Sequence, residues 1–393
     1  MGRGDRLLPA PGLRLLFAFV GGRGHFDPLL PLAVAARAAG HDVLGFACRP
    51  SMVGEVAAAE FAAAPVGPDV PETSDRTALL RPDPAREEKV MRRGFAGVTA
   101  RRRAAELIAL GRDLRPDILV ADEVDFGAFV AAEALGLPYA SVIVLAAGGL
   151  ARAEVIAEPL AELRATVGLV ADPEPGTLHR HVVIAPMPPS FRDPAHPLPV
   201  HTIAIRPASL ERAHTDHPWP AASDRPKIYV TLGTIFNRES GDLFERLIDA
   251  AGGVDADVLV TTGGSLDPDA FGPQPEHVRV ERYVPQAAVL PSADLVVSHG
   301  GSGSVIGALA HGVPLVLLPM GADQLDNARR CTALGVGRTL DPLRTSASEL
   351  RHAFVAVLGD ERYRMRAQRL ATEASALPGP EHAMRMLEAV AAH

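Results

Sequence analysis

Cysteine and lysine are both scarce in this sequence. Of 393 residues only two are cysteine, Cys48 and Cys331, and lysine occurs only at positions 89 and 227. Two distant cysteines without a CxxC pair argue against a disulfide framework and against a structural zinc site. This usage is typical of a reducing compartment, and we expect a cytoplasmic protein.

A net positive charge and long apolar runs are also lacking. The formal net charge is −8, which argues against nucleic-acid binding, because neutralising phosphates needs a basic face. The apolar run at 13–20 leads into a glycine-rich turn without a small-residue cleavage site, so it predicts a buried strand and not a signal peptide. No run reaches the length of a membrane span, and we expect none.

The composition that remains is that of a globular chain, with 47% hydrophobic and 22% charged residues. Short apolar runs alternate with helical patterns, which predicts parallel sheets with crossover helices. In the first half the predicted strands are 13–20, 41–47, 118–121, 140–145 and 202–205. A second alternation begins at 227, after a proline-rich stretch.

These shifts in composition divide the chain. We predict an N-terminal domain over 1–206 with a disordered start at 1–12, a proline-rich linker over 207–226 and a C-terminal domain over 227–379. A closing helix is expected within 380–393. The arginine run at 101–103 is interpreted as a solvated helix face.

The stretch "ADLVVSHGGSGSVIGALAHG", from 293 to 312, predicts a strand, a glycine-rich turn and a helix from about Ser304. Glycines without side chains let an anion approach the main chain, and the helix start attracts phosphate. Hydroxyl and imidazole groups add donors. The candidate phosphate-binding residues are His299, Gly300, Gly301, Ser302, Gly303 and Ser304. A turn required only for strand–helix packing explains the loop alone equally well.

A dinucleotide-binding loop is the rival interpretation, and it would make the protein an NAD-dependent dehydrogenase. After Gly301 and Gly303 the next glycine is Gly307, one residue too late for GxGxxG. In "GGRGHFDP" Asp27 occupies the third glycine position. Both spacings therefore disfavour this alternative.

A candidate general base lies in the same first-half turn. His25 follows a strand and glycines and precedes a helix that we expect Asp27 to cap, and its imidazole titrates in the range needed to deprotonate a hydroxyl. The helix start is expected to disfavour the imidazolium. Asp122 ends the strand 118–121 on the same sheet edge, where it can orient the ring. Glu123 and Asp125 are alternatives for that role.

The longer stretch "RYVPQAAVLPSADLVVSHGGSGSVIGALAHGVPLVLLPMGADQLDNA", 282–328, resembles the nucleotide-sugar-binding region of the large inverting glycosyltransferase family. That family includes bacterial antibiotic glycosyltransferases, plant natural-product glucosyltransferases and animal glucuronosyltransferases. The resemblance implies the GT-B fold, two facing Rossmann-like doubly wound domains with an interdomain cleft. It also implies that the closing helix crosses back to the N-terminal domain.

The resemblance assigns roles to single residues. Tyr283 falls where the family stacks an aromatic ring on the nucleobase, and Gln286 falls near the base and ribose. The glycine loop matches the diphosphate site, and Asp323 and Gln324 match the pair that holds sugar hydroxyls. Thr234 ends another phosphate-facing strand, with Asn237 a weaker candidate. His25 matches the histidine of G-H-x-x-P, and Asp122 the aspartate after a PDLLV-like strand.

One departure bears on the donor. Gly307 stands where many plant members have the glutamate that takes the ribose hydroxyls, which favours a dTDP-sugar over a UDP-sugar. The sequence thus predicts an inverting, metal-independent transfer from a nucleotide sugar, a co-substrate and not a cofactor, to an apolar natural-product acceptor. We expect a monomer or homodimer. A catalytically silent sugar-nucleotide-binding relative remains an alternative.

Overall fold

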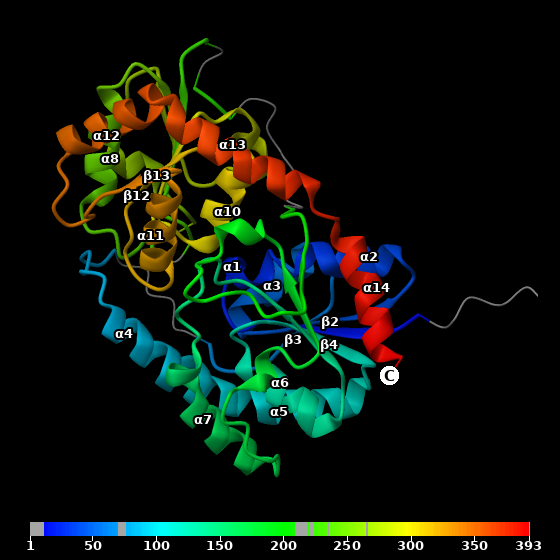
Figure 1. The fold of residues 1–393 in the computed structure, drawn as a ribbon. Helices are drawn as coiled ribbons and strands as arrows, with labels where there is room; N and C mark the ends of the chain where they lie inside the picture. Colours follow the sequence, from blue (N-terminus) through cyan, green and yellow to red (C-terminus); the bar gives the residue numbers. More distant parts are fainter. Residues whose placement is uncertain are drawn as a thin grey trace, which may run out of the picture.

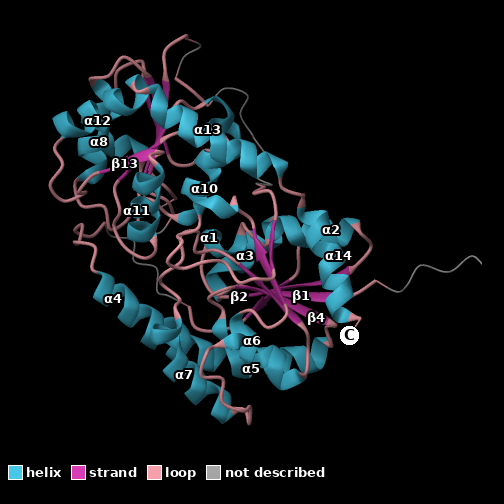
Figure 2. Ribbon diagram, in the orientation of Figure 1, coloured by secondary structure: helices cyan, strands magenta, loops and turns pink. Residues whose placement is uncertain are grey.

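Two parallel β-sheets form the two lobes of the molecule. The computed structural model describes residues 12–69, 76–208, 218–220, 223–234, 236–264 and 266–392. The sheet of the first lobe has the strand order β3-β2-β1-β4-β5-β6-β7, and that of the second lobe has the order β10-β9-β8-β11-β12-β13. Figure 1 shows the lobes next to each other, and Figure 2 shows helices around the strands. The predicted fold class, two doubly wound parallel-sheet domains, is confirmed.

The first lobe contains seven short strands and the helices that connect them. Its strands are β1 (Arg14–Ala18), β2 (Asp42–Cys48), β3 (Ala63–Pro65), β4 (Ile118–Asp122), β5 (Tyr139–Val142), β6 (Val182–Ala185) and β7 (Thr202–Ala204). Its helices are α1 (Arg23–Phe26), α2 (Leu30–Ala38), α3 (Val53–Ala58), α4 (Pro84–Lys89), α5 (Ala100–Leu114), α6 (Phe126–Leu135) and α7 (Ala153–Thr166), with a π-helical segment Val90–Thr99 between α4 and α5.

All five strands predicted for this half are present, and two more were not predicted. The strand β3 is only Ala-Ala-Pro, and β6 runs within four residues into a proline-rich stretch, so neither shows a clear strand pattern. Helix α2 ends as expected, with Gly40 at φ +87° just past its cap, a conformation that favours glycine. It begins at Leu30, however, and Asp27 does not cap it.

The second lobe repeats the same alternation. Its strands are β8 (Lys227–Thr231), β9 (Asp257–Thr261), β10 (Val278–Glu281), β11 (Leu295–Ser298), β12 (Leu315–Leu317) and β13 (Gly337–Thr339). Its helices are α8 (Leu243–Gly252), α9 (Gln286–Val289), α10 (Ser302–Ala310), α11 (Gln324–Leu334), α12 (Ala347–Gly359) and α13 (Glu361–Ala376). The alternation of strands and helices that was predicted to begin at 227 is therefore present.

The order of the strands fixes where a ligand can bind. In the first sheet β1 lies between β2 and β4, and in the second β8 lies between β9 and β11, so the direction of winding reverses at these strands. Loops separate there at the carboxyl ends of the strands and leave a crevice. The loop with His25 follows β1 and Asp122 ends β4, while Thr234 follows β8 and His299 follows β11.

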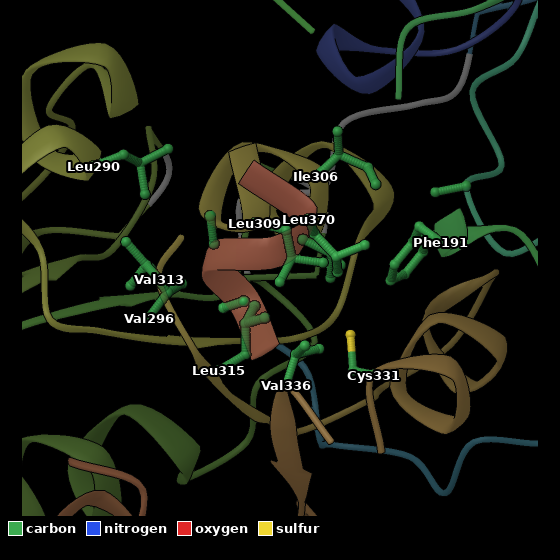
Figure 3. Close-up of a cluster of buried hydrophobic side chains, with 14 of the residues drawn as sticks. Phe191, Leu290, Val296, Ile306, Leu309, Val313, Leu315, Cys331, Val336 and Leu370 are labelled. Atoms are coloured by element: carbon green, nitrogen blue, oxygen red, sulfur yellow. The ribbon is translucent and has the colours of Figure 1, made fainter. Parts of the chain in front are cut away.

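Hydrophobic side chains and hydrogen bonds join the two lobes. Phe191 of the first lobe is fully buried and points toward Ile306, Leu370 and Cys331 of the second (Figure 3). The guanidinium of Arg330 donates to the carbonyl oxygens of Phe191 and Ser190 at 2.8 and 2.7 Å. The lobes therefore share a continuous core along one side.

The last helix, α14 (Pro380–Ala391), lies against the first lobe beside α2 (Figure 1). Ala383, Met384 and Leu387 are buried in the hydrophobic cluster that contains strand β1. His41 Nε2 lies 3.0 Å from a Glu388 carboxylate oxygen. The limits predicted for the domains stay predictions, since 1–11, 209–217 and 221–222 lie outside the described residues.

Candidate active site

A histidine and a buried aspartate meet at the switch point of the first sheet. His25 Nδ1 lies 3.3 Å from Asp122 Oδ2, and the Asp122 side chain is 0% exposed while that of His25 is 21% exposed. The backbone N–H groups of Val20 and Val124 donate to the two Asp122 oxygens at 2.8 and 2.9 Å. The carboxylate is therefore fixed in place, and the imidazole beside it remains accessible.

The charge balance around His25 differs from the one predicted. Burial lowers the pKa of His25, but the charge and hydrogen bond of Asp122 and the charges of Asp323 and Glu123 raise it, and the net shift is upward. The helix start, which we expected to disfavour the imidazolium, does not decide the net direction of the shift. Helix α1 has only four residues, so three nearby carboxylates outweigh its dipole.

Two neighbours shape the space around the His25 ring. A Cβ atom on Gly21 would lie 2.0 Å from His25 Cδ2, so only glycine at this position leaves room for the ring. On the π-helical segment, Phe95 lies nearly parallel to the imidazole, with an interplanar angle of 14° and 6.4 Å between ring centroids. Apolar surface thus lies beside the candidate base.

The alternative acids are already engaged. Asp125 is fully buried and accepts two hydrogen bonds from the guanidinium of Arg103. Glu123 accepts from the N–H groups of Val144 and Leu145 at 2.7 and 2.6 Å. Among the three acids, Asp122 is the one paired with His25.

Arg103 itself corrects one expectation. Its side chain is buried, not part of a solvated helix face, and its remaining N–H groups donate to the carbonyl oxygens of Val66 and Ala47. A buried guanidinium is tolerated because a carboxylate and carbonyl oxygens satisfy it. A charge run in the sequence does not reveal such an internal partner.

The glycine-rich loop of the second lobe begins a helix without a side-chain cap. Gly300 has φ +91°, and α10 begins at Ser302, two residues earlier than predicted. Its N-cap residue is Gly301, so no cap side chain takes the first N–H groups of the helix. A Cβ on Gly303 would have no neighbour within 4 Å. The main chain here is open to a ligand, as a diphosphate site requires.

His299 lies beneath this loop as a neutral imidazole. Burial lowers its pKa to about 4, and only 8% of the residue is exposed. Cβ atoms on Gly233 or Gly301 would come within 3 Å of the ring, so the two glycines enclose it. Its buried Nδ1 has no hydrogen-bond partner among the described residues. A neutral ring can still donate one N–H to an anion.

The other residues that were predicted to contact the nucleotide, two for the nucleobase and ribose and two for phosphate, belong to the second lobe. Tyr283 is 47% exposed, and the Arg23 guanidinium of the first lobe lies 5.8 Å from its ring centroid. The Gln286 amide donates to Ser304 Oγ at 3.4 Å. Thr234 is exposed where the loop leaves β8. Asn237, the weaker candidate, is fully buried, and its amide nitrogen donates to the Thr262 carbonyl.

The two residues of the acid–amide pair at the start of α11 have different hydrogen-bond partners. Asp323 Oδ2 accepts hydrogen bonds from Ser302 Oγ at 2.6 Å and from Asn327 Nδ2 at 2.8 Å. Gln324 is buried, and its side-chain oxygen accepts from the N–H groups of Met320 and Gly321. The side-chain oxygen of Gln324 is thus engaged by the main chain, whereas its amide nitrogen takes no part in these bonds.

The two halves of the site face each other. The Asp323 charge raises the pKa of His25; burial raises the pKa of Asp323, and the His25 charge opposes that shift. Such mutual influence requires that the two groups lie close across the boundary between the lobes. The structure therefore brings His25 and Asp122 together with the glycine loop and with the pair Asp323 and Gln324.

Sequence reasoning missed three residues of this site. Asn327 lies in the stretch 282–328, four positions after Asp323. Residues four apart lie on the same face of a helix, so this spacing could have predicted the contact between the Asn327 amide and Asp323. Arg23 stands inside the quoted "GGRGH" turn. Phe95 had no signal, because the π-helical backbone that orients it shows no pattern of its own.

Membrane and metal features can be checked over the same residues. Within the described ranges no helix combines the length and apolar character needed to cross a bilayer. In that part of the chain no group of three or more His, Cys, Asp or Glu side chains is placed to hold a metal ion.

Comparison with known proteins identifies relatives of the whole chain. Residues 245–390 match the family described as erythromycin biosynthesis protein CIII-like, C-terminal domain. The 4'-demethylrebeccamycin synthase of Lentzea aerocolonigenes is 30% identical over 96% of this chain and 99% of its own length.

Solved structures show the same architecture. The glycosyltransferase SnogD from Streptomyces nogalater is 27% identical, with a TM-score of 0.76 over 97% of this chain and 99% of its own. The glycosyltransferase SsfS6 of Streptomyces sp. SF2575, solved in complex with thymidine diphosphate, is also 27% identical, with a TM-score of 0.76 over 96% and 99% of the two chains.

Proposed function

Because this chain belongs to the family of antibiotic glycosyltransferases built from two parallel-sheet domains, we propose that it is an inverting enzyme with His25 as its general base. The reaction transfers a sugar from a nucleotide sugar to a hydroxyl, or another nucleophile, of a natural product. The observation that carries this proposal is the His25–Asp122 pair facing the glycine loop. Family membership leaves the dehydrogenase alternative without support.

The chemistry is a single in-line displacement. His25 takes the proton of the acceptor hydroxyl as its oxygen attacks the anomeric carbon, and the bond from that carbon to the diphosphate oxygen breaks on the opposite face. Asp122 orients the ring and stabilises the imidazolium that forms. The proton stays on His25 until solvent removes it, and the electron pair leaves with the diphosphate.

The second lobe stabilises the leaving group without a metal ion in this proposal. The open N–H groups at the start of α10 and one N–H of His299 meet the diphosphate charge, with the Thr234 hydroxyl on the facing strand end. Tyr283 stacks on the base, Gln286 binds near the ribose, and Asp323 and the Gln324 amide hold sugar hydroxyls.

A thymidine nucleotide is the proposed donor carrier. A Cβ on Gly307 would lie 3.5 Å from Gln286 Oε1, so position 307 faces the residue assigned to the ribose but offers no acceptor for its 2'-hydroxyl. The structure of SsfS6 with thymidine diphosphate supports the same choice for a relative. Deoxyribose needs no such acceptor.

An apolar acceptor fits the first lobe. Val20, Phe95 and Leu150 are partly buried side chains packed on the same hydrophobic cluster. Of these, Phe95 lies against the base itself. An acceptor that covers this surface gains burial of apolar area while its hydroxyl reaches His25.

Two measurements test the proposal. Calorimetry with dTDP, UDP and GDP should show the tightest binding for dTDP, and tighter binding of UDP would overturn the donor assignment. NMR of the product, or of the sugar released by slow donor hydrolysis, should show the anomeric configuration opposite to that of the donor. Retention would contradict the mechanism, and the absence of both transfer and hydrolysis would favour the catalytically silent alternative.

A further inference from the structure

A buried amide joins the two lobes directly at the sugar-binding acid. Asn327 on α11 is 0% exposed, and its side-chain oxygen accepts from the N–H of Ala147 in the first lobe at 3.0 Å. Its nitrogen donates to Gly300 O at 2.9 Å and to Asp323 Oδ2 at 2.8 Å. One side chain thus contacts the opposite lobe, the glycine loop and the carboxylate.

The orientation of this amide is set by its neighbours. The N–H of Ala147 can only donate, so it requires the amide oxygen, whereas Gly300 O and the Asp323 carboxylate can only accept and require the nitrogen. A rotated amide would place an oxygen against two acceptors. Aspartate at this position could keep the contact with Ala147 but could not donate to the other two.

Ser302 makes a second connection of the same kind. Its oxygen accepts from the N–H of Ala146 at 2.7 Å and donates to Asp323 Oδ2 at 2.6 Å. Ala146 and Ala147 are both buried, so their N–H groups need partners, and a buried N–H without one is strongly unfavourable. Two consecutive N–H groups of the first lobe, those of Ala146 and Ala147, therefore donate to the side chains of Ser302 and Asn327. Both of these side chains in turn donate to Asp323 Oδ2.

We propose that Asn327, together with Ser302, is a positioning residue that couples docking of the first lobe to the placement of the Asp323 carboxylate. When the lobes are docked, the Asn327 amide and the Ser302 hydroxyl each accept from the first lobe and donate to Asp323 Oδ2. This fixes Oδ2 and leaves Oδ1 of Asp323 to face a sugar hydroxyl. When they separate, both side chains lose their partners in the first lobe. The inference rests on the proposed sugar-binding role of Asp323.

The first test separates sugar binding from nucleotide binding. Asn327→Ala should lower kcat/KM for the nucleotide sugar about 10- to 100-fold, the usual effect of losing a hydrogen bond to a charged group, while the affinity for free dTDP changes less than about 2-fold. Thr332→Val on the exposed face of α11 is the matched control, because it removes hydroxyl bonds to Ala328 O and Thr339 Oγ1 that involve neither Asp323 nor the first lobe, and should leave both values unchanged. Equal losses for sugar donor and free dTDP would overturn the proposal.

A double-mutant cycle tests whether Asn327 acts through Asp323. In an Asp323→Ala background, Asn327→Ala should have little further effect on kcat/KM, because there is no carboxylate left to position. Additive losses would contradict this inference alone. If Asp323→Ala by itself leaves donor use unchanged, the proposed sugar-binding role fails, and the inference fails with it.

Docking of the lobes can be followed separately. The two native cysteines are buried, so cysteines introduced on the exposed faces of α2 and α12 can carry a fluorophore pair. With dTDP bound, Asn327→Ala and Ser302→Ala should show a longer or broader distance distribution than the parent protein, and an unchanged distribution would overturn the coupling. Asn327→Asp serves if the alanine variant does not fold, because it keeps an oxygen for Ala147 and should lose donor use similarly.

Discussion

Each lobe places a histidine directly after a strand at or beside the switch point of its sheet, and the two histidines have opposite acid–base properties. His25 follows β1, at which the winding of the first sheet reverses, and His299 follows β11, the neighbour of the corresponding strand β8. Carboxylates from Asp122, Asp323 and Glu123 raise the pKa of His25 despite burial, whereas burial alone lowers the pKa of His299 to about 4. Neighbouring carboxylates in the one case, and burial alone in the other, give the two pKa shifts their opposite directions.

Removal of the first histidine should have the largest effect. His25→Ala should lower kcat by roughly two to four powers of ten, because the acceptor hydroxyl loses its base, while calorimetry should find dTDP binding unchanged. His25→Gln provides a control with similar size and no basicity. Near-normal turnover in either variant would contradict the assignment of the base.

Removal of the second histidine should be smaller and should affect binding as well. His299→Ala should lower kcat about 10- to 100-fold and also weaken dTDP binding, because a donor to the diphosphate is lost in both states. Steady-state kinetics and calorimetry on the same preparation check this. Turnover loss with intact dTDP affinity would make the two histidines alike and would remove the contrast between the lobes.

The pH dependence of kcat/KM should report the titration of His25 and not that of His299. A general base must be neutral, so kcat/KM should fall as pH drops through the raised pKa of His25, above its ordinary value near 6.5. Asp122→Asn removes the main upward cause and should move this acid limb to lower pH while lowering the maximum rate. A limb that stays in place would show that Asp122 does not set the pKa of the base.

The smallest expected effect of the two opposite pKa shifts is on the free energy of unfolding. His299 has a lower pKa folded than unfolded, so its contribution falls as pH drops from about 6.5 toward about 4, by on the order of 1–3 kcal/mol. His25 has the opposite sign, since its stabilisation is present below pH 6.5 and is lost as pH rises through its raised pKa. Urea unfolding of His299→Asn at several pH values should show a flatter acid side than the parent.

Much of this site followed from the order of strands in the sequence. His25 and Asp122 stand at the ends of predicted strands that proved to be neighbours, and the parallel geometry brought the two side chains within 3.3 Å. Glycines between a buried strand and a helix start located the loop as a point where an anion can reach the main chain, and the resemblance of 282–328 favoured a diphosphate site over a packing turn.

The remainder depended on contacts that no local pattern encodes. The bond between Asn327 and Ala147 joins residues 180 positions apart and forms only when two lobes dock. The burial of Arg103 depends on Asp125 and on carbonyl oxygens of neighbouring strands. The direction of the His25 pKa required knowing that carboxylates from both lobes converge on one ring.

The position of α14 has a consequence for how the molecule is made. Strand β1 emerges early in synthesis, yet part of its hydrophobic cover, Met384 and Leu387, comes from the last helix. The first lobe cannot complete its core until residues 380–391 have been translated, by which time the second lobe has been synthesised. A nascent chain stopped before residue 380 would therefore present an exposed apolar surface on the lobe that was translated first.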